Sequence, residues 1–177
     1  MKQKFLIFAA LAALVAGLTA CDKQETPASG GTEGESKEDN KYYVGTFRVG
    51  EDFSIPDTQV GIVLSEDRTS ADIYLLKVRF SEQMPMSFDF RIPEVPVSVS
   101  NEKIIFAWED TENPITPVWI QGEGRETPYS AYQVTVVSGT AGPDDGRKET
   151  CDFSITFVGT DPGRPSTVEV NYQGSKN

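Results

Sequence analysis

The chain has 177 residues, no histidine, two cysteines and a formal net charge of −11. Without histidine, Ser-His-Asp triads, Cys-His dyads and histidine-based zinc sites are excluded. The strong negative charge disfavours nucleic-acid binding, which requires basic stripes, and no glycine-rich phosphate-binding motif occurs. We therefore expect a protein that is not an enzyme, with no catalytic residue, no metal, no cofactor and no nucleic-acid partner.

The N-terminal segment has the order of a secretory signal. Two lysines precede an apolar run from Phe5 to Ala20, which is shorter than the roughly 20 residues of a membrane-spanning helix. The run leads into the letters LTAC, ending at Cys21, which resemble the lipobox of bacterial lipoproteins. The resemblance implies that residues 1–20 are a lipoprotein signal peptide and that lipidated Cys21 anchors the chain to a membrane. An ordinary signal peptide with a coincidental cysteine is the alternative.

Residues 21–40 are predicted to be the lipidated cysteine followed by a disordered acidic linker. From Asp22 to Asn40 there is no leucine, isoleucine, valine or aromatic residue, and six acidic residues outweigh two lysines. Such a segment cannot bury enough apolar surface to offset the entropy of ordering. Its expected role is to hold the following domain away from the bilayer, and a specific acidic binding tail is the alternative.

Residues 41–177 are predicted to form one all-β domain. Runs of β-branched and aromatic residues recur between clusters of glycine, proline, aspartate and asparagine, and no stretch of ten residues has helical periodicity. The predicted strands are Tyr42–Val49, Thr58–Leu64, Ala71–Phe80, Ser87–Ile92, Glu102–Trp108, Pro117–Gln121, Tyr129–Val137, Thr150–Val158 and Thr167–Tyr172.

Two of these runs show a clear period of two, which directs one face toward the core and the other toward water. In Thr150–Val158 the apolar face consists of Phe153, Ile155 and Phe157. In Tyr129–Val137 the same reasoning puts Tyr132, Val134 and Val136 on one face and Gln133 and Thr135 on the other.

Short loops favour antiparallel meanders, and about eight such strands must close on themselves or form two packed sheets to avoid open edges. We expect an antiparallel up-and-down eight-stranded β-barrel, with a β-sandwich as the alternative. Pro93 and Pro96 make Ile92–Val99 an edge, a bulge or a chain crossing. Gly45 and Gly61 suit bulges or close strand packing at the corners of a barrel.

Three segments resemble the calycin-like, lipocalin-like β-barrel lipoproteins of Gram-negative gut bacteria. They are YVGTFRV from Tyr43, DFRIPEVPVSV from Asp89 and VEVNYQGSK from Val168, whereas Glu109–Thr127 and Ala141–Lys148 have no counterpart. The resemblance implies an up-and-down barrel, attachment to the outer membrane and no established activity. It supplies no catalytic residues.

Two further features have an ordinary structural interpretation. Cys151 opens an alternating strand and is expected to be a buried thiol, since Cys21 is used by the anchor and no base accompanies it. The paired carboxylates Glu109-Asp110 and Asp144-Asp145 lie in turn-like sequence, where acids serve local hydrogen bonding more often than glycoside hydrolysis or calcium binding.

The candidate ligand-binding residues are Trp108, Trp119, Tyr129 and Tyr132. Amphipathic aromatic side chains near loops often line the mouth of a ligand site, although packing in the core is the alternative. The expected function is a lipid-anchored cell-envelope lipoprotein that binds a small apolar or amphipathic ligand in its barrel. The alternative is a protein- or glycan-interaction module, for adhesion, with a filled core.

Overall fold

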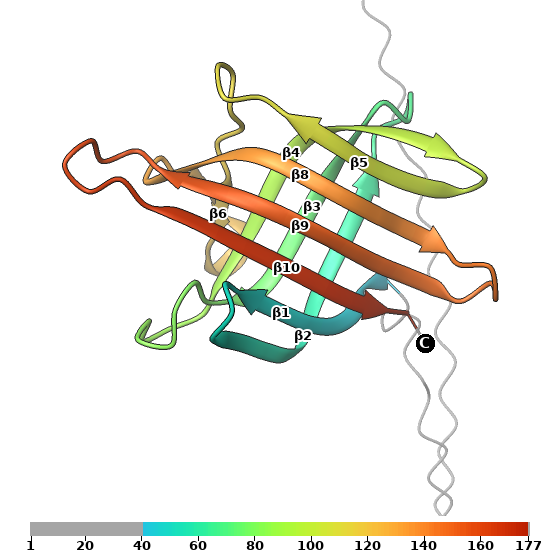
Figure 1. Cartoon of the computed structure of the whole chain (residues 1–177), viewed down its shortest axis with the longest axis horizontal. Helices are drawn as coiled ribbons and strands as arrows, with labels where there is room; N and C mark the ends of the chain where they lie inside the picture. Colours follow the sequence, from blue (N-terminus) through green and yellow to red (C-terminus); the bar gives the residue numbers. More distant parts are fainter. Residues whose placement is uncertain (1–40, 177) are drawn as a thin grey trace, which may run out of the picture. The chain divides into compact units, whose positions relative to one another are not determined.

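The computed structural model describes residues 41–176 (Figure 1), so the predicted signal peptide, Cys21 and the linker lie outside the described residues. The described chain consists almost entirely of strands. They are β1 (Tyr43–Val49), β2 (Phe53–Leu64), β3 (Ser70–Val78), β4 (Phe88–Ser100), β5 (Lys103–Glu109), β6 (Val118–Ile120), the 3-10 helix η2 (Gly122–Gly124), β7 (Glu126–Pro128), β8 (Tyr132–Pro143), β9 (Glu149–Gly159) and β10 (Thr167–Ser175).

All the strands belong to one antiparallel sheet. Their order is β3-β2-β1-β10-β9-β8-β5-β4-β6-β7, and a further pairing of β3 with β4 closes eight of them into a ring, which we call the closed sheet. β1 pairs with β10, so the first and last strands are neighbours. The predicted all-β, antiparallel, up-and-down arrangement of eight strands is confirmed, and the alternative of a β-sandwich is wrong.

One strand position of the closed sheet, next to β4, is shared by two strands, β5 and β6. β5 pairs with the C-terminal residues of β4, whereas β6 pairs with the N-terminal residues of β4. Between these two pieces, Ile115 forms a single bridge to Val134 of β8. β7 pairs only with β6 and extends the sheet beyond the ring. The closed sheet is therefore not a regular barrel, because the position between β4 and β8 is interrupted.

Pro93 of β4 lies in a bulge, one of the three outcomes predicted for Ile92–Val99, and Pro96 pairs with Ser70 of β3 just beyond it. The pairing of β4 with β3 shifts register at this point. Glu94 between the prolines has a φ of +53°, and its N–H donates to Asp72 Oδ1 at 2.8 Å. A side-chain acceptor thus satisfies the backbone where the prolines interrupt the ladder.

Both glycines predicted to lie at corners are closely packed. A Cβ on Gly45 would lie 2.0 Å from the carbonyl oxygen of Gln173 in β10, and the pairing of β1 with β2 shifts register directly after it. A Cβ on Gly61 would lie 3.0 Å from the ring of Tyr42, but β2 and β3 pair regularly there. Gly45 therefore combines a close approach with a bulge, and Gly61 has the close approach alone.

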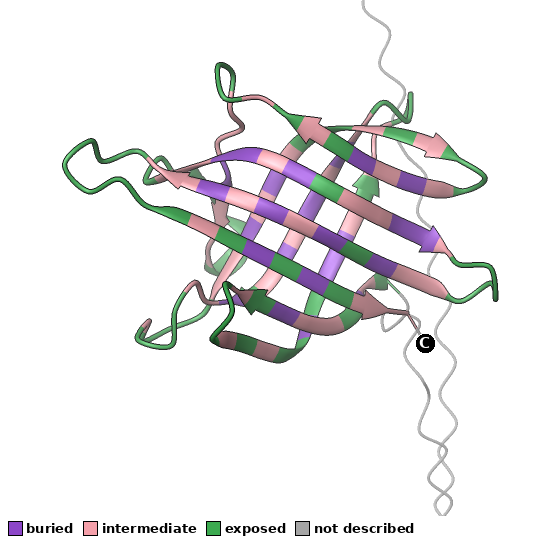
Figure 2. Ribbon diagram, in the orientation of Figure 1, coloured by how far each residue is buried: buried purple, intermediate pink, exposed green. Residues whose placement is uncertain are grey.

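The interior of the closed sheet is filled with side chains. Buried residues alternate with mostly half-buried ones along β9 and with exposed ones along β10, as Figure 2 shows. The alternation predicted for β9 is confirmed, because Phe153, Ile155 and Phe157 are all buried. The largest fully buried side chains are Tyr172, Phe47, Phe90, Phe106, Phe157, Ile73, Leu75, Ile92, Ile155, Val60, Val78 and Val95.

The alternation predicted for β8 is wrong beyond Val134. The pairing of β8 with β9 has a bulge between Val134 and Val136, which inserts one residue and reverses the faces that follow. As a result Thr135 is 7% exposed and Val137 is fully buried, whereas Val136 is half-buried.

Several strands differ from the prediction in their boundaries, and β8 runs from Tyr132 to Pro143 instead of from Tyr129 to Val137. β2 begins at Phe53 rather than at Thr58, because Pro56 and Asp57, which have the composition of a turn, lie within a strand that pairs with β1. β4 continues through its prolines to Ser100. β7 was not predicted at all.

Cys151 is a free thiol buried in β9, as the sequence predicts. Burial, reinforced by the neighbouring Asp152 carboxylate, raises the pKa of the Cys151 thiol. A protonated thiol that is closed off from solvent is a poor nucleophile. Among residues 41–176, no helix has the length and apolar character needed to cross a membrane.

Candidate functional site: the aromatic end of the closed sheet

The up-and-down topology gives the closed sheet two different ends (Figure 1). The connections 50–52, 79–87, 110–131 and 160–166 lie at one end, which we call the aromatic end. The connections 65–69, 101–102 and 144–148 lie at the other end, together with the start of β1 and the last strand's C-terminus. We call this second end the terminal end.

Eight aromatic side chains are joined by ring contacts at the aromatic end, and we call them the aromatic cluster. Three of them are buried and the other five are half-buried, so the cluster extends from the core to the surface. The buried members are Phe47, Phe90 and Phe157, and the half-buried members are Phe80, Phe88, Trp119, Tyr129 and Tyr132.

The structure brings three of the four predicted site residues into this cluster. Trp119 on β6 makes an edge contact with Phe88, with ring centroids 5.6 Å apart. Tyr129 and Tyr132 stack with centroids 6.3 Å apart and an interplanar angle of 15°. Trp108 on β5 is half-buried against the core and has no ring contact with the cluster in the described part of the chain. The predicted grouping therefore holds for Trp119, Tyr129 and Tyr132 and not for Trp108.

None of the five phenylalanines of the cluster was predicted as a site residue, and three of them lie in or near the connection between β3 and β4. Phe88 and Phe90 begin β4, and Phe80 follows the end of β3. In the sequence, all three are ordinary apolar positions of strand-like runs. Their only distinguishing signal is that they lie within or just after a connection rich in polar residues, methionine and proline. Reasoning from strand faces alone does not use that signal.

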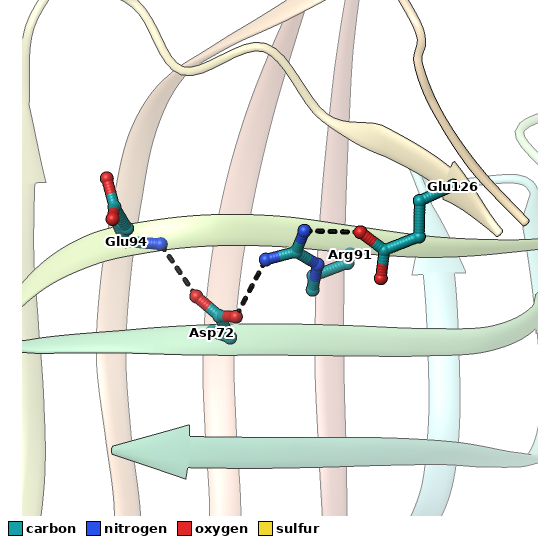
Figure 3. A network of polar contacts seen from close by, with 4 residues as sticks. All are labelled: Asp72, Arg91, Glu94 and Glu126. Carbon is teal, nitrogen blue, oxygen red and sulfur yellow. Dashed lines mark hydrogen bonds and ion pairs between the residues drawn. The ribbon is translucent and has the colours of Figure 1, made fainter. Parts of the chain in front are cut away.

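Trp119 reaches the cluster on a flap, which consists of β6, η2 and β7 (residues 118–128). Its inward position follows from register, because Trp119 pairs with the buried Phe90. A salt bridge on the outer face fixes the flap to the closed sheet (Figure 3). Arg91 of β4 donates from Nη2 to Glu126 of β7 at 2.6 Å and from Nη1 to Asp72 of β3 at 2.9 Å.

Arg91 thus connects three strands. Burial opposes its charge, but the hydrogen bonds that it donates to Glu126 and Asp72 outweigh that effect and raise the pKa of the Arg91 guanidinium. Its Nε is buried without a hydrogen-bond partner among the described residues. Both acidic partners are therefore needed to compensate the desolvation of this side chain.

Replacing Glu126 by glutamine is expected to loosen the flap without unfolding the closed sheet. The change removes one charged partner of Arg91 and keeps the size of the side chain. A partly exposed pair contributes about 0.2–1 kcal/mol, so the amide hydrogens of β6 and β7 should exchange up to about fivefold faster. Hydrogen exchange detected by mass spectrometry measures this. The matched control is Glu123→Gln in η2 of the same flap, and equal exchange rates in the two variants would contradict the role of Glu126.

One carboxylate of each pair singled out in the sequence is engaged with the backbone of its own turn, whereas Glu109 is the last residue of β5. Asp110 accepts hydrogen bonds from the N–H groups of Asn113 and Glu112, which hold the pKa of its carboxyl below the usual range. Asp144 accepts hydrogen bonds from N–H groups of the turn between β8 and β9. Within residues 41–176, no three cysteine, aspartate or glutamate side chains come together in a group that could hold a metal ion.

Two hollows lie on the outside of the closed sheet, and neither touches the aromatic cluster. A shallow one of about 350 Å³ crosses β8, β9 and β10 and is lined mainly by polar side chains such as Ser138, Asp152 and Asn171. A second, of about 780 Å³, lies at the terminal end between the turns after β4 and β8. Its lining includes both acidic and basic side chains.

No protein-family model, no curated protein and no solved structure matches the chain.

Proposed function

We propose that the protein is a non-catalytic lipoprotein of the cell envelope that binds a small apolar or amphipathic molecule at the aromatic end. The observation that carries this proposal is the half-buried state of Phe80, Phe88, Trp119, Tyr129 and Tyr132, which are in ring contact at one end of the closed sheet. Aromatic side chains bury large areas on contact, and the tyrosine hydroxyls and the tryptophan N–H add polar partners for an amphipathic ligand.

The place of the ligand follows from the packing. Deep in the closed sheet the volume is taken up by buried side chains, so a ligand would be held by the half-buried rings and the connections around them. The proposed site is therefore the mouth of the closed sheet, which is where the sequence-based hypothesis put the candidate aromatic residues.

The cellular context of the proposal comes from the sequence. The lipobox-like segment supports lipid anchoring at Cys21, and the similarity to calycin-like lipoproteins supports attachment to the outer membrane. The membrane is then a partner through the anchor alone, because the net charge of −11 opposes adsorption of the protein to anionic lipid.

Tryptophan substitution tests the site. We expect the chain from residue 21 with Cys21→Ser, called the unlipidated chain below, to bind the uncharged fluorophore N-phenyl-1-naphthylamine with a single site. Trp119→Phe should weaken binding roughly tenfold, because it shortens the aromatic surface on the flap. Trp108→Phe is the matched control outside the cluster and should leave the affinity unchanged. Equal effects of the two substitutions, measured by fluorescence titration, would remove the aromatic end from consideration.

The filled interior favours a second candidate, a protein- or glycan-interaction module with a solid core. Its expected signature is a clean ligand-free mass in native mass spectrometry after incubation with lipid extracts, together with binding to a protein or polysaccharide. A reproducible extra mass in the same spectrum, which is lost on denaturation and belongs to an apolar compound, would favour the first candidate, the binding of a small ligand.

A further inference from the structure

Phe80 lies at the centre of the aromatic cluster. Its ring centroid is 5.0 Å from that of Phe157, 5.6 Å from Phe90, 6.1 Å from Tyr132 and 6.5 Å from Phe47. These four rings come from β9, β4, β8 and β1, which belong to different parts of the closed sheet. One side chain thus fills the space where four strands converge.

Phe80 differs from these four neighbours in how its backbone is held. Each neighbour lies on a strand, where ladder hydrogen bonds fix the position of its Cα. Phe80 belongs to the connection 79–87, which lies outside the strands. In the described part of the chain the two hydrogen bonds of this connection stay within it, from the N–H of Phe80 to Met84 Sδ and from the N–H of Met84 to the carbonyl oxygen of Ser81.

The attachment of this connection to the rest of the molecule is therefore mainly apolar. Besides Phe80, it contacts the closed sheet through the Arg79 guanidinium, which lies 5.4 Å from the ring centroid of Phe53. Met86, at the far side of the connection, is 58% exposed. Displacing Phe80 would break contacts between rings and leave the hydrogen bonds of the closed sheet intact.

We propose that the position of the Phe80 ring is a binding subsite for a phenyl-sized apolar group, and that Phe80 occupies this subsite until a ligand displaces it. The proposal rests on the function proposed above and names the chemical class that the site takes. A planar ring of this size regains the contacts with Phe157, Phe90 and Tyr132 that Phe80 gives up. The connection 79–87 is then no longer held against the closed sheet by the Phe80 ring, so its two internal hydrogen bonds open more often.

Competition between Phe80 and a ligand predicts the direction in which the binding affinity changes when Phe80 is replaced. If Phe80 fills the subsite, removing its ring should tighten the binding of an external ring, whereas removing an ordinary site residue weakens binding. The free energy of burying a phenylalanine side chain corresponds to roughly 10- to 100-fold in affinity.

The experiment is a titration of the unlipidated chain with N-phenyl-1-naphthylamine. We expect Phe80→Ala to bind 10- to 100-fold more tightly than the wild-type chain, with one site, and Phe80→Leu to lie between them. Met86→Ala, in the same connection, should bind as the wild type does. Phe106→Ala opens a cavity among buried residues that lie outside the aromatic cluster and should show no gain. Circular dichroism establishes that each variant is folded, and Phe80→Leu preserves the test if the alanine variant unfolds.

A second readout uses the wild-type chain. Saturation with the fluorophore should increase deuterium uptake in residues 81–87 while leaving uptake in β9 unchanged.

Three results would overturn the proposal. Equal or weaker binding by Phe80→Ala, with a wild-type chain that binds, would reject the subsite and leave the proposed function standing. A similar gain in Phe80→Ala and Phe106→Ala would show that any cavity accepts the fluorophore. No binding by any variant would reject the proposed function as well.

Discussion

Replacement of Gly45 by alanine is expected to destabilise the protein by about 3 kcal/mol or more. The added Cβ would lie 2.0 Å from the carbonyl oxygen of Gln173 and 2.4 Å from the Cα of Gly174, both of which are backbone atoms of β10. Backbone atoms within a ladder cannot rotate away as the end of a side chain can. The methyl group must therefore separate β1 from β10, and this is the pair that joins the first and last strands of the closed sheet.

Urea unfolding followed by circular dichroism measures the loss. Gly122→Ala is the matched control, because nothing lies within 4 Å of the position that its Cβ would take. We expect that variant to stay within about 0.5 kcal/mol of the wild type. If Gly45→Ala were equally mild, β1 and β10 could not be as closely paired as the structure has them.

Raising the pH is expected to unfold this protein at a lower pH than is needed to unfold an average β domain. Burial is the main cause that raises the pKa values of Tyr43, Tyr172 and Cys151, and these three groups lie together at the terminal end. The Tyr43 hydroxyl also donates to Glu149 at 3.1 Å, and that carboxylate further disfavours a phenolate. Each of the three groups is thus kept protonated by the fold.

The direction of the pH effect follows from the protons bound in each state. In the unfolded chain the thiol and the phenols lose their protons near their ordinary pKa values of about 8.5 and 10. Their contribution to stability is complete below those values. It declines as pH rises further, because the unfolded state releases protons that the folded state retains.

Each group lowers the free energy of unfolding by at most about 1.4 kcal/mol per pH unit in this range. The midpoint of urea unfolding should therefore fall steeply between about pH 9 and 12. Tyr43→Phe removes one of the three groups and should make the decline shallower, although it also removes the hydrogen bond to Glu149. A midpoint that is independent of pH up to 12, or an equally steep decline in Tyr43→Phe, would contradict a role for this buried cluster.

The fold was more predictable from the sequence than its irregularities were. Alternation in β9 identified Phe153, Ile155 and Phe157 as core residues, because a regular strand directs every second side chain to the same face. The same reasoning was wrong in β8, where the bulge after Val134 changes the faces. A bulge depends on the partner strand, so Thr135 carries no local sign of its burial.

The candidate site was predicted in part for a similar reason. Trp119, Tyr129 and Tyr132 are close in sequence, and the flap and the start of β8 bring them together. Trp108 is equally close in sequence, but it lies on β5, which pairs with β8. The chain reaches the N-terminal part of β4 only later, at β6. The position of Phe80 depends on contacts with four strands far apart in the sequence, and no local pattern can reveal it.

The pairing of Val44 with Ser175 places the start and the finish of the closed sheet side by side. A chain that enters at Lys41 therefore enters at the terminal end. The 11 residues of β9 correspond to roughly 35 Å between the terminal and the aromatic ends along that strand. The end of the closed sheet at which residue 41 enters is therefore opposite to the end that holds the aromatic cluster. Whatever is joined to the chain before residue 41 is thus attached at the end away from the aromatic rings.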